Sequence, residues 1–245
     1  MKNVNGKVRI LGVIPARGGS KSIPHKNIAL LSGKPLIYYT IQEAKKSKLL
    51  DAFVVSTDDA KIARVSSTIG ADVPFLRPKR YAQDRSPDIE FLEHALKWLK
   101  FHRGWEPEIV VILRPTSPLR TSREIDGVIR FILKTRCDSV KSVSLPYPYN
   151  PFKMWFLDSR TKKMKPILPT PYFKKLGTDV PRQLLPTVYW QNGLVDATRA
   201  KFIKRGRVFG PDMRGFITDP RLSVDVDSVE DLKRAAPSIK RFKYP

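Results

Sequence analysis

The stretch Val8-Arg-Ile-Leu-Gly-Val-Ile14 runs directly into Pro15-Ala-Arg-Gly-Gly-Ser-Lys-Ser-Ile-Pro-His-Lys-Asn27. Its first part is short, apolar and rich in β-branched residues, which predicts a buried strand. The proline and the two adjacent glycines that follow predict a loop. A basic, glycine-rich loop directly after a buried strand is typical of the ligand-binding edge of an open α/β sheet.

The same alternation of strand and helix continues along the chain. Short apolar runs predict strands at 52–56, 73–76, 108–113, 139–144, 188–195 and 222–226. Amphipathic spacing predicts helices at 35–46, 88–102, 122–134 and 227–236, and another helix capped by Asp58 that ends near residue 69. Strands that alternate with helices imply an α/β fold, with a mostly parallel sheet and helices on both faces.

Residues 145–186 break this rhythm. They are rich in proline, lysine and aromatic residues and show weak periodicity. We expect an excursion from the sheet, in the form of a short hairpin arm. We therefore predict one domain over residues 1–245, with an arm inserted at 145–186 and a loose basic tail at 237–245.

The 245 residues carry 46 basic and 23 acidic side chains, which gives a net charge of +23. Such an excess invites a nucleic-acid role, but no zinc-ligand spacing, basic helix with heptads or aromatic strand motif accompanies it. We expect no nucleic-acid partner. No apolar run approaches the roughly 20 residues of a membrane span, no signal peptide is visible, and the single cysteine, Cys137, fits a reducing cytoplasm.

The loop at 15–27 suits a polyanionic ligand. Gly18 and Gly19 allow the backbone to approach an anion closely, and their N–H groups can point at phosphate oxygens. Arg17, Lys21 and Lys26 add positive charge. The spacing of a P-loop is absent. The plainer alternative is a basic surface turn.

A second candidate site lies in Leu222-Ser-Val-Asp-Val-Asp227. On a strand, Asp225 and Asp227 face the same side, opposite two buried valines. Two carboxylates on one face suit Mg²⁺ or Mn²⁺, with phosphate oxygens and water completing the shell. The alternative is a half-exposed strand in which Asp227 caps the following helix.

A third loop, Leu113-Arg-Pro-Thr-Ser-Pro-Leu-Arg120, follows the central strand at the same edge. Arg114 and Arg120 could meet anions, and Thr116 or Ser117 could bond a base or a sugar. The alternative is a proline-stiffened turn, with Thr121 or Ser122 capping the next helix.

An ordered set of motifs resembles the acylneuraminate cytidylyltransferase family, the CMP-sialic acid synthetases. The resemblance spans roughly residues 8–236 and implies a Rossmann-like nucleotidyltransferase fold, CTP, Mg²⁺ and a 2-keto-3-deoxy sugar acid. It also implies a homodimer, with 145–186 as the exchanged arm. The motifs are Ala16-Arg-Gly-Gly-Ser-Lys21 with Lys26-Asn27, Ser56-Thr-Asp58, Arg114-Pro-Thr-Ser-Pro-Leu-Arg120, Pro181-Arg-Gln183, Gln191-Asn-Gly193 and Ser223-Val-Asp-Val-Asp227.

The resemblance also implies roles for single residues. Arg17 and Lys21 would stabilise the departing pyrophosphate, and Asp225 would hold the metal that assists catalysis. The implied nucleotide contacts are Arg17, Gly18, Gly19, Ser20, Lys21 and Lys26 for the triphosphate, Asn27 for the ribose, and Arg77 and Ser86 for cytosine. The implied metal ligands are Asp225 and Asp227, and the implied sugar-acid contacts are Arg114, Arg182, Gln183 and Asn192.

The sequence departs from the family pattern mainly on the sugar side. Ser22 stands for a usual Gly, Asp88 for a frequent Ser, Arg114 for a usual Gln, and Trp190 for an Arg that sialic acid enzymes often have. These changes leave the acceptor open. The alternative functions are a cytidylyltransferase for another small acid, a metal-dependent glycosyltransferase, and a non-enzymatic polyanion-binding protein.

Overall fold

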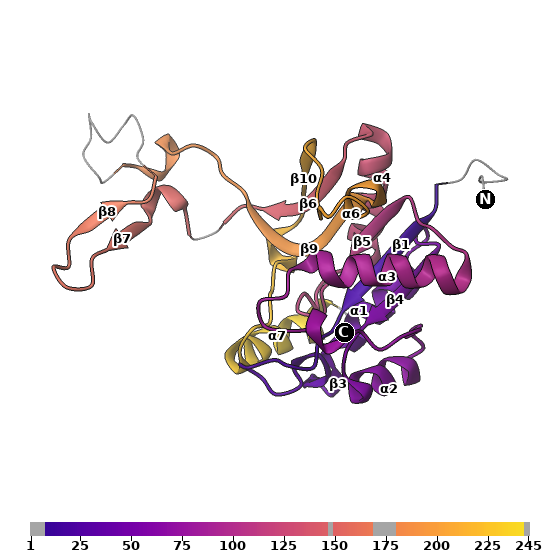
Figure 1. Cartoon of the computed structure of the whole chain (residues 1–245). Helices are drawn as coiled ribbons and strands as arrows, with labels where there is room; N and C mark the ends of the chain where they lie inside the picture. The colour runs from indigo at the N-terminus through magenta and orange to yellow at the C-terminus, as the bar shows by residue number, and fades with distance from the viewer. Residues whose placement is uncertain (1–7, 147–148, 169–179, 243–245) are drawn as a thin grey trace.

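The computed structural model describes residues 8–146, 149–168 and 180–242. A six-stranded sheet forms its centre (Figure 1). The strands, in spatial order, are β10 (Met213–Ile217), β6 (Ser139–Ser144), β9 (Trp190–Arg199), β5 (Ile109–Ile112), β1 (Ile10–Pro15) and β4 (Ala52–Ser56).

The sheet is mostly parallel. β1 pairs in parallel with β4 and β5, and β10 pairs in parallel with β6. β9 is antiparallel to both β5 and β6. The four residues of β5 are all buried, which is typical of strands covered on both faces. The predicted α/β class with a mostly parallel sheet is confirmed, although the periodicity did not reveal the reversed direction of β9.

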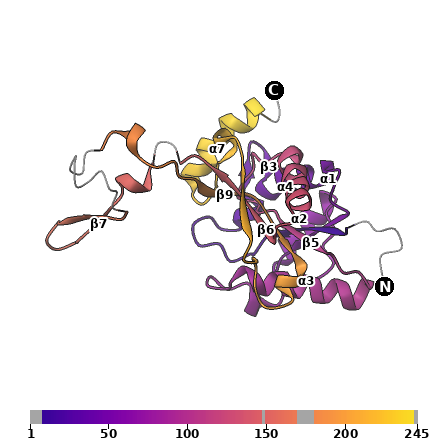
Figure 2. The same ribbon diagram turned by 90° about the horizontal axis from the view of Figure 1, so that it is seen from above.

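Helices cover both faces of the sheet (Figure 2). The helices α1 (Leu36–Lys46), α2 (Ala60–Thr68) and α4 (Ser122–Thr135) pack in one apolar core with the sheet. The helices α3 (Asp88–Arg103) and α6 (Ala200–Ile203) pack in a second core on the opposite face. A third core joins α7 (Val229–Phe242) to α1 and to the short hairpin of β2 (Leu30–Leu31) and β3 (Lys34–Pro35).

Side-chain caps fix where two of these helices begin. Thr121 and Glu124 form a capping box at α4. Asp59, not the predicted Asp58, caps α2, because its Oδ1 accepts from the N–H groups of Lys61 and Ile62 at 2.7 and 3.0 Å. This shift of one residue leaves Asp58 available for another contact, described below.

Two expectations near the C-terminus are wrong. Residues 222–226 form no strand. Leu222 ends a 3₁₀ turn at Pro220–Leu222, and among the described residues one backbone hydrogen bond, from the N–H of Val226 to the carbonyl of Thr116, ties the segment to the sheet edge. Residues 237–242 are not a loose tail, since α7 continues through Pro237 with Ile239 buried. The predicted strand at 73–76 is reduced to isolated bridges at Asp72 and Leu76.

The predicted hairpin arm is present within the described part of 145–186. β7 (Trp155–Leu157) pairs with β8 (Met164–Pro166) in an antiparallel hairpin that projects away from the body (Figure 1). Residues 147–148 and 169–179 of the expected arm lie outside the described residues. Two further 3₁₀ turns, Pro151–Lys153 and Arg182–Leu184, precede and follow the hairpin in the sequence.

Candidate active site

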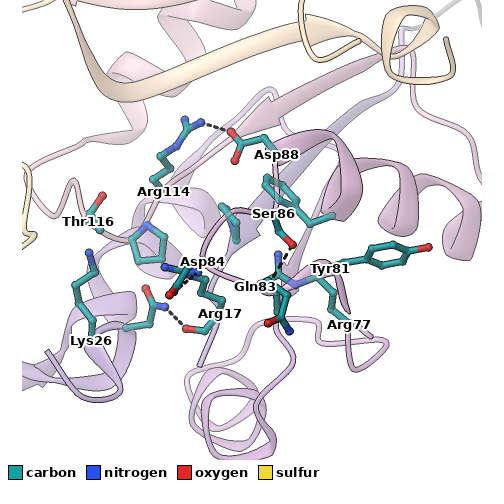
Figure 3. A pocket seen from close by; sticks show the side chains of 15 residues that line it. Arg17, Lys26, Arg77, Tyr81, Gln83, Asp84, Ser86, Asp88, Arg114 and Thr116 are labelled. Atoms are coloured by element: carbon teal, nitrogen blue, oxygen red, sulfur yellow. Dashed lines mark hydrogen bonds and ion pairs between the residues drawn. The ribbon is translucent and has the colours of Figure 1, made fainter. Parts of the chain in front are cut away.

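A cavity of about 280 Å³ lies where β1 and β5 end. Open α/β sheets bind ligands at this carboxyl edge. Six of the predicted site residues line the cavity: Arg17, Lys26, Asn27, Arg77, Ser86 and Arg114 (Figure 3). They come from three segments that are far apart in the sequence, and the fold brings these segments together at one edge of the sheet.

Two side chains, Asn27 and Asp58, form hydrogen bonds with the backbone of the loop after β1. Asn27 is buried and donates from Nδ2 to the carbonyl of Arg17 at 2.9 Å. The N–H of Gly18 donates to Oδ1 of Asp58 at 2.9 Å, so this amide is engaged by protein rather than free for phosphate. Gly18 has to be glycine here, because a Cβ would approach the Cβ of Asp59 to 2.8 Å.

Acidic residues pair with the cations of this loop. Oδ1 of Asp84 lies 3.0 Å from Nη1 of Arg17, and Oδ2 lies 2.5 Å from Nζ of Lys21. The hydrogen bond from Lys21 is the main cause that lowers the pKa of Asp84 below its ordinary value. Nζ of Lys26 lies 2.7 Å from Oδ1 of Asp227.

A second hollow, of about 370 Å³, adjoins the first. Gly19, Ser20 and Lys21 line it, together with Asp84, which also lines the first cavity. The predicted phosphate residues are therefore divided between two neighbouring hollows. Asp84 lies between them.

Arg77 is the buried cation of the first cavity. Its side chain is 4% exposed, and Nε and Nη2 have no hydrogen-bond partner among the described residues. Burial lowers the pKa of Arg77. Nη2 lies 4.0 Å from Oδ1 of Asp58. Unsatisfied buried donors are costly, so this guanidinium is suited to a ligand that offers acceptor oxygens or nitrogens.

Arg114 lines the cavity and forms ion pairs with two carboxylates. It donates to Asp88 at the start of α3 and to Asp196 on β9. Burial lowers the pKa of Arg114, but the charges of Asp88 and Asp196 outweigh burial and raise it. Arg120, the other predicted anion contact of this loop, is fully buried and donates to the carbonyls of Leu194 and Arg114. It therefore has a structural role.

Neither Asp225 nor Asp227 lines the cavity, and no strand carries them, but each contacts a residue that does: Asp227 pairs with Lys26, and Asp225 accepts a hydrogen bond from Thr116. Burial is the main cause that raises the pKa of Asp225, and the charge of Asp227 adds to it, against a hydrogen bond from Thr116. Within residues 8–146, 149–168 and 180–242, no three or more His, Cys, Asp or Glu side chains are grouped so that they could hold a metal ion by themselves. Two carboxylates fit a Mg²⁺ ion that takes its other ligands from phosphate and water.

Comparison with known proteins agrees with this geometry. The profile of the family described as Cytidylyltransferase matches residues 11–164 of the chain. The chain belongs to the cytidylyltransferase family.

Named relatives refine this assignment. The cytidylyltransferase described here is 41% identical over 162 residues to the CMP-N,N'-diacetyllegionaminic acid synthase of Legionella pneumophila, covering 66% of this chain and 68% of the relative. It is 35% identical over 124 residues to an N-acylneuraminate cytidylyltransferase of Escherichia coli, covering 51% of this chain and 28% of the relative. The resemblance to acylneuraminate cytidylyltransferases is confirmed, and the protein is a nucleotidyltransferase.

The fold has a solved counterpart. The structure of a CMP:2-keto-3-deoxy-manno-octonic acid synthetase complexed with CTP superimposes with a TM-score of 0.68 at 14% identity, covering 95% of this chain and 99% of that chain. This likeness confirms the nucleotidyltransferase fold. None of the cytidylyltransferase's described helices is both long and apolar enough to cross a membrane.

Of the four predicted sugar-side residues, Arg114 lines the cavity and the other three do not. Arg182 and Gln183 are exposed in the 3₁₀ turn that leads from the arm, and neither lines the cavity. Asn192 is buried, with Nδ2 donating to Thr218 and Ser223 at 2.8 Å each. In this chain Asn192 thus holds β9 to the segment that carries the aspartates.

The sequence patterns did not identify residues 81–84 as part of the site. Tyr81, Gln83 and Asp84 line the cavity alongside Ser86. The signal that could have found this segment is the run of polar residues Gln83-Asp-Arg85, which lies between the two residues predicted to contact cytosine, Arg77 and Ser86.

Proposed function

We propose that the protein transfers CMP from CTP to the anomeric hydroxyl of a sialic-acid-like 2-keto-3-deoxy sugar acid and releases pyrophosphate. The observation that carries this proposal is the cationic cavity at the carboxyl edge of the sheet, with Asp225 and Asp227 in contact with its lining residues Thr116 and Lys26. The legionaminic and acylneuraminic acids in the relatives' names support this acceptor class.

The reaction needs no covalent nucleophile. The acceptor hydroxyl attacks the α-phosphorus in line, so the protein acts by positioning and by neutralising charge. Arg17 and Lys21 bind the departing pyrophosphate, and Lys26 contacts the triphosphate. Arg77 offers its unpaired donors to the base.

Asp225 and Asp227 would hold the divalent cation. When bound, Mg²⁺ polarises the α-phosphate. Lys26 neutralises part of the charge on Asp227, which limits the repulsion between the two carboxylates. A cytoplasmic location fits the use of CTP and the single buried thiol of Cys137.

The decisive assay is pyrophosphate release from CTP and Mg²⁺ with a panel of sialic, legionaminic, pseudaminic and 3-deoxy-octulosonic acids. We expect release with one nonulosonic acid and a loss of at least about 100-fold in Asp225→Asn. The matched control is Asp212→Asn, an exposed aspartate paired with Arg214 on β10, which should keep full activity. Silence with every acid, together with no CTP binding, would contradict the proposal.

We further propose that the protein is a homodimer joined through the β7–β8 arm. The arm projects from the body, and its side chains at Phe156, Leu157 and Met164 are 62%, 59% and 59% exposed (Figure 1). Grouped exposed apolar side chains mark interaction surfaces. A second copy of the chain is the partner that buries them symmetrically.

A further inference from the structure

Asp84 forms ion pairs with both Arg17 and Lys21, the two cations that the proposed function gives to the departing pyrophosphate. The carboxylate of Asp84 binds Arg17 with Oδ1 at 3.0 Å and Lys21 with Oδ2 at 2.5 Å. Figure 3 shows Asp84 against Arg17 in the centre of the cavity. Each oxygen of the carboxylate thus serves one cation, as the oxygens of a phosphate group would.

The segment that carries Asp84 is held in shape by its own hydrogen bonds. The Oγ of Ser86 donates to the carbonyl of Arg80 at 3.2 Å and accepts from the N–H of Gln83 at 3.2 Å. Nε2 of Gln83 donates to the carbonyl of Lys79 at 2.6 Å. Asp84 therefore lies in a closed turn, and its position depends on that of the whole turn.

The same segment carries the residues assigned to the base. Arg77 and Ser86 line the cavity on either side of the turn. The N–H of Arg77 donates to the carbonyl of Thr57 at 2.7 Å, which anchors one end to the sheet edge. The ion pairs of Asp84 thus tie the base side of the cavity to the loop after β1.

We propose that Asp84 is an internal counter-ion that competes with the triphosphate for Arg17 and Lys21. The proposal rests on the proposed function, because it takes CTP as the donor. A carboxylate and a phosphate oxygen cannot both approach one ammonium closely without repelling each other. Binding of the triphosphate therefore displaces Asp84.

The competition also assists product release. As pyrophosphate leaves, Asp84 binds Arg17 and Lys21 again, so both cations regain a counter-ion. Product release limits the turnover of many enzymes. Asp84 acts here as a positioning residue, which lowers the affinity for pyrophosphate and thereby speeds its departure.

The test measures separately the affinity for pyrophosphate and the affinity for cytidine, which represent the two ends of the nucleotide. Isothermal titration of the full chain with inorganic pyrophosphate and with cytidine compares wild type with Asp84→Asn, which removes the charge but keeps the shape. We expect pyrophosphate to bind about five- to tenfold more tightly to the variant, with cytidine affinity unchanged. In the steady state, the inhibition constant of pyrophosphate should fall by the same factor.

Asp72→Asn is the matched control. Asp72 pairs with Arg103 outside the cavity, and its side chain is 39% exposed against 38% for Asp84. This variant should change neither affinity. A second variant, Lys21→Met combined with Asp84→Asn, should lose most of the gain in pyrophosphate affinity.

Unchanged or weaker pyrophosphate binding in a folded Asp84→Asn protein would overturn the inference, as would parallel losses for pyrophosphate and cytidine. Asp84→Ser replaces it if the asparagine variant does not fold. Failure of the wild type to bind CTP at all is a different result, since it contradicts the proposed function rather than the role of Asp84.

Discussion

The guanidinium of Arg114 donates from Nη1 to Oδ2 of Asp196 at 2.8 Å, across 82 positions of sequence. The side chain of Asp196 is 5% exposed, and its Oδ1 has no hydrogen-bond partner within the described part of the chain. Arg114 also binds Asp88. A buried carboxylate on β9 thus depends on one arginine from the loop after β5.

Removing Arg114 should therefore destabilise the fold. Breaking a buried pair leaves an uncompensated charge, and we expect Arg114→Met to lower the free energy of unfolding by about 3 kcal/mol. Adding Asp196→Asn to that variant should recover much of the loss. Urea unfolding of both single variants and the double variant gives the coupling energy. Equal stability of Arg114→Met and the double variant would contradict this account.

Arg77 leads to a prediction about binding rather than stability. Nε and Nη2 of Arg77 have no partner among the described residues, and the proposed function assigns this side chain to the base, so Arg77→Met should raise the Kd of CTP by about tenfold or more. Inorganic pyrophosphate lacks a base, and its Kd should stay within about twofold of the wild-type value. Titration calorimetry measures both. Equal losses for the two ligands would show that Arg77 serves the phosphates instead.

The sequence predicted much of the site because its signals are local. A buried strand followed by a basic loop is visible in a short window, and the order of the strands then brings Arg17, Lys26 and Arg114 to one sheet edge. The partners of these cations could not be predicted in this way. Nothing in the pattern around Asp84 or Asp196 indicates which distant arginine each will meet.

The wrong strand at 222–226 has a physical cause as well. Val224 and Val226 alternate with polar residues as in a half-buried strand, but a strand also needs a neighbour to pair with. Within the part of the chain that the structure describes, only the N–H of Val226 has a backbone partner at the sheet edge, the carbonyl of Thr116. Val226 is buried in the core that includes α7, and Val224 packs against that core. The alternation of valines with polar residues therefore reflects which side chains are buried, and it does not show that the backbone is a paired strand.

If the arm joins two copies of the chain, polar substitutions in the arm should convert the proposed dimer to a monomer. Leu157 and Met164 face each other across the β7–β8 hairpin and are both exposed, so Leu157→Ser with Met164→Ser should weaken association with little effect on the fold. Phe101→Ser on α3 is the matched control, since Phe101 is 81% exposed on the body. Light scattering after gel filtration should report a monomer for the arm variant alone. A dimer that persists in the arm variant would place the interface elsewhere.

His94 predicts how stability depends on pH. It packs edge-on against Phe75, with ring centroids 4.7 Å apart, and its Nδ1 has no partner among the described residues. Burial, followed by the charges of Arg77 and Arg80, lowers the pKa of His94 below its ordinary value of 6.5. The folded protein therefore disfavours the protonated ring.

The sign follows from proton linkage. Between the lowered pKa of the folded state and 6.5, the unfolded state binds more protons than the folded state, so stability rises with pH in that window. We expect the wild-type Tm to fall as the pH is lowered through 6.5, and His94→Phe to flatten this dependence while keeping the aromatic packing. His102→Phe, on the same helix, is the comparison variant, since it makes the same exchange at a site outside the contact with Phe75. Arg77 and Arg80 are the charged groups that disfavour protonation of His94. If the Tm of His94→Phe depended on pH as steeply as that of the wild type, the pH dependence would come from another titratable group.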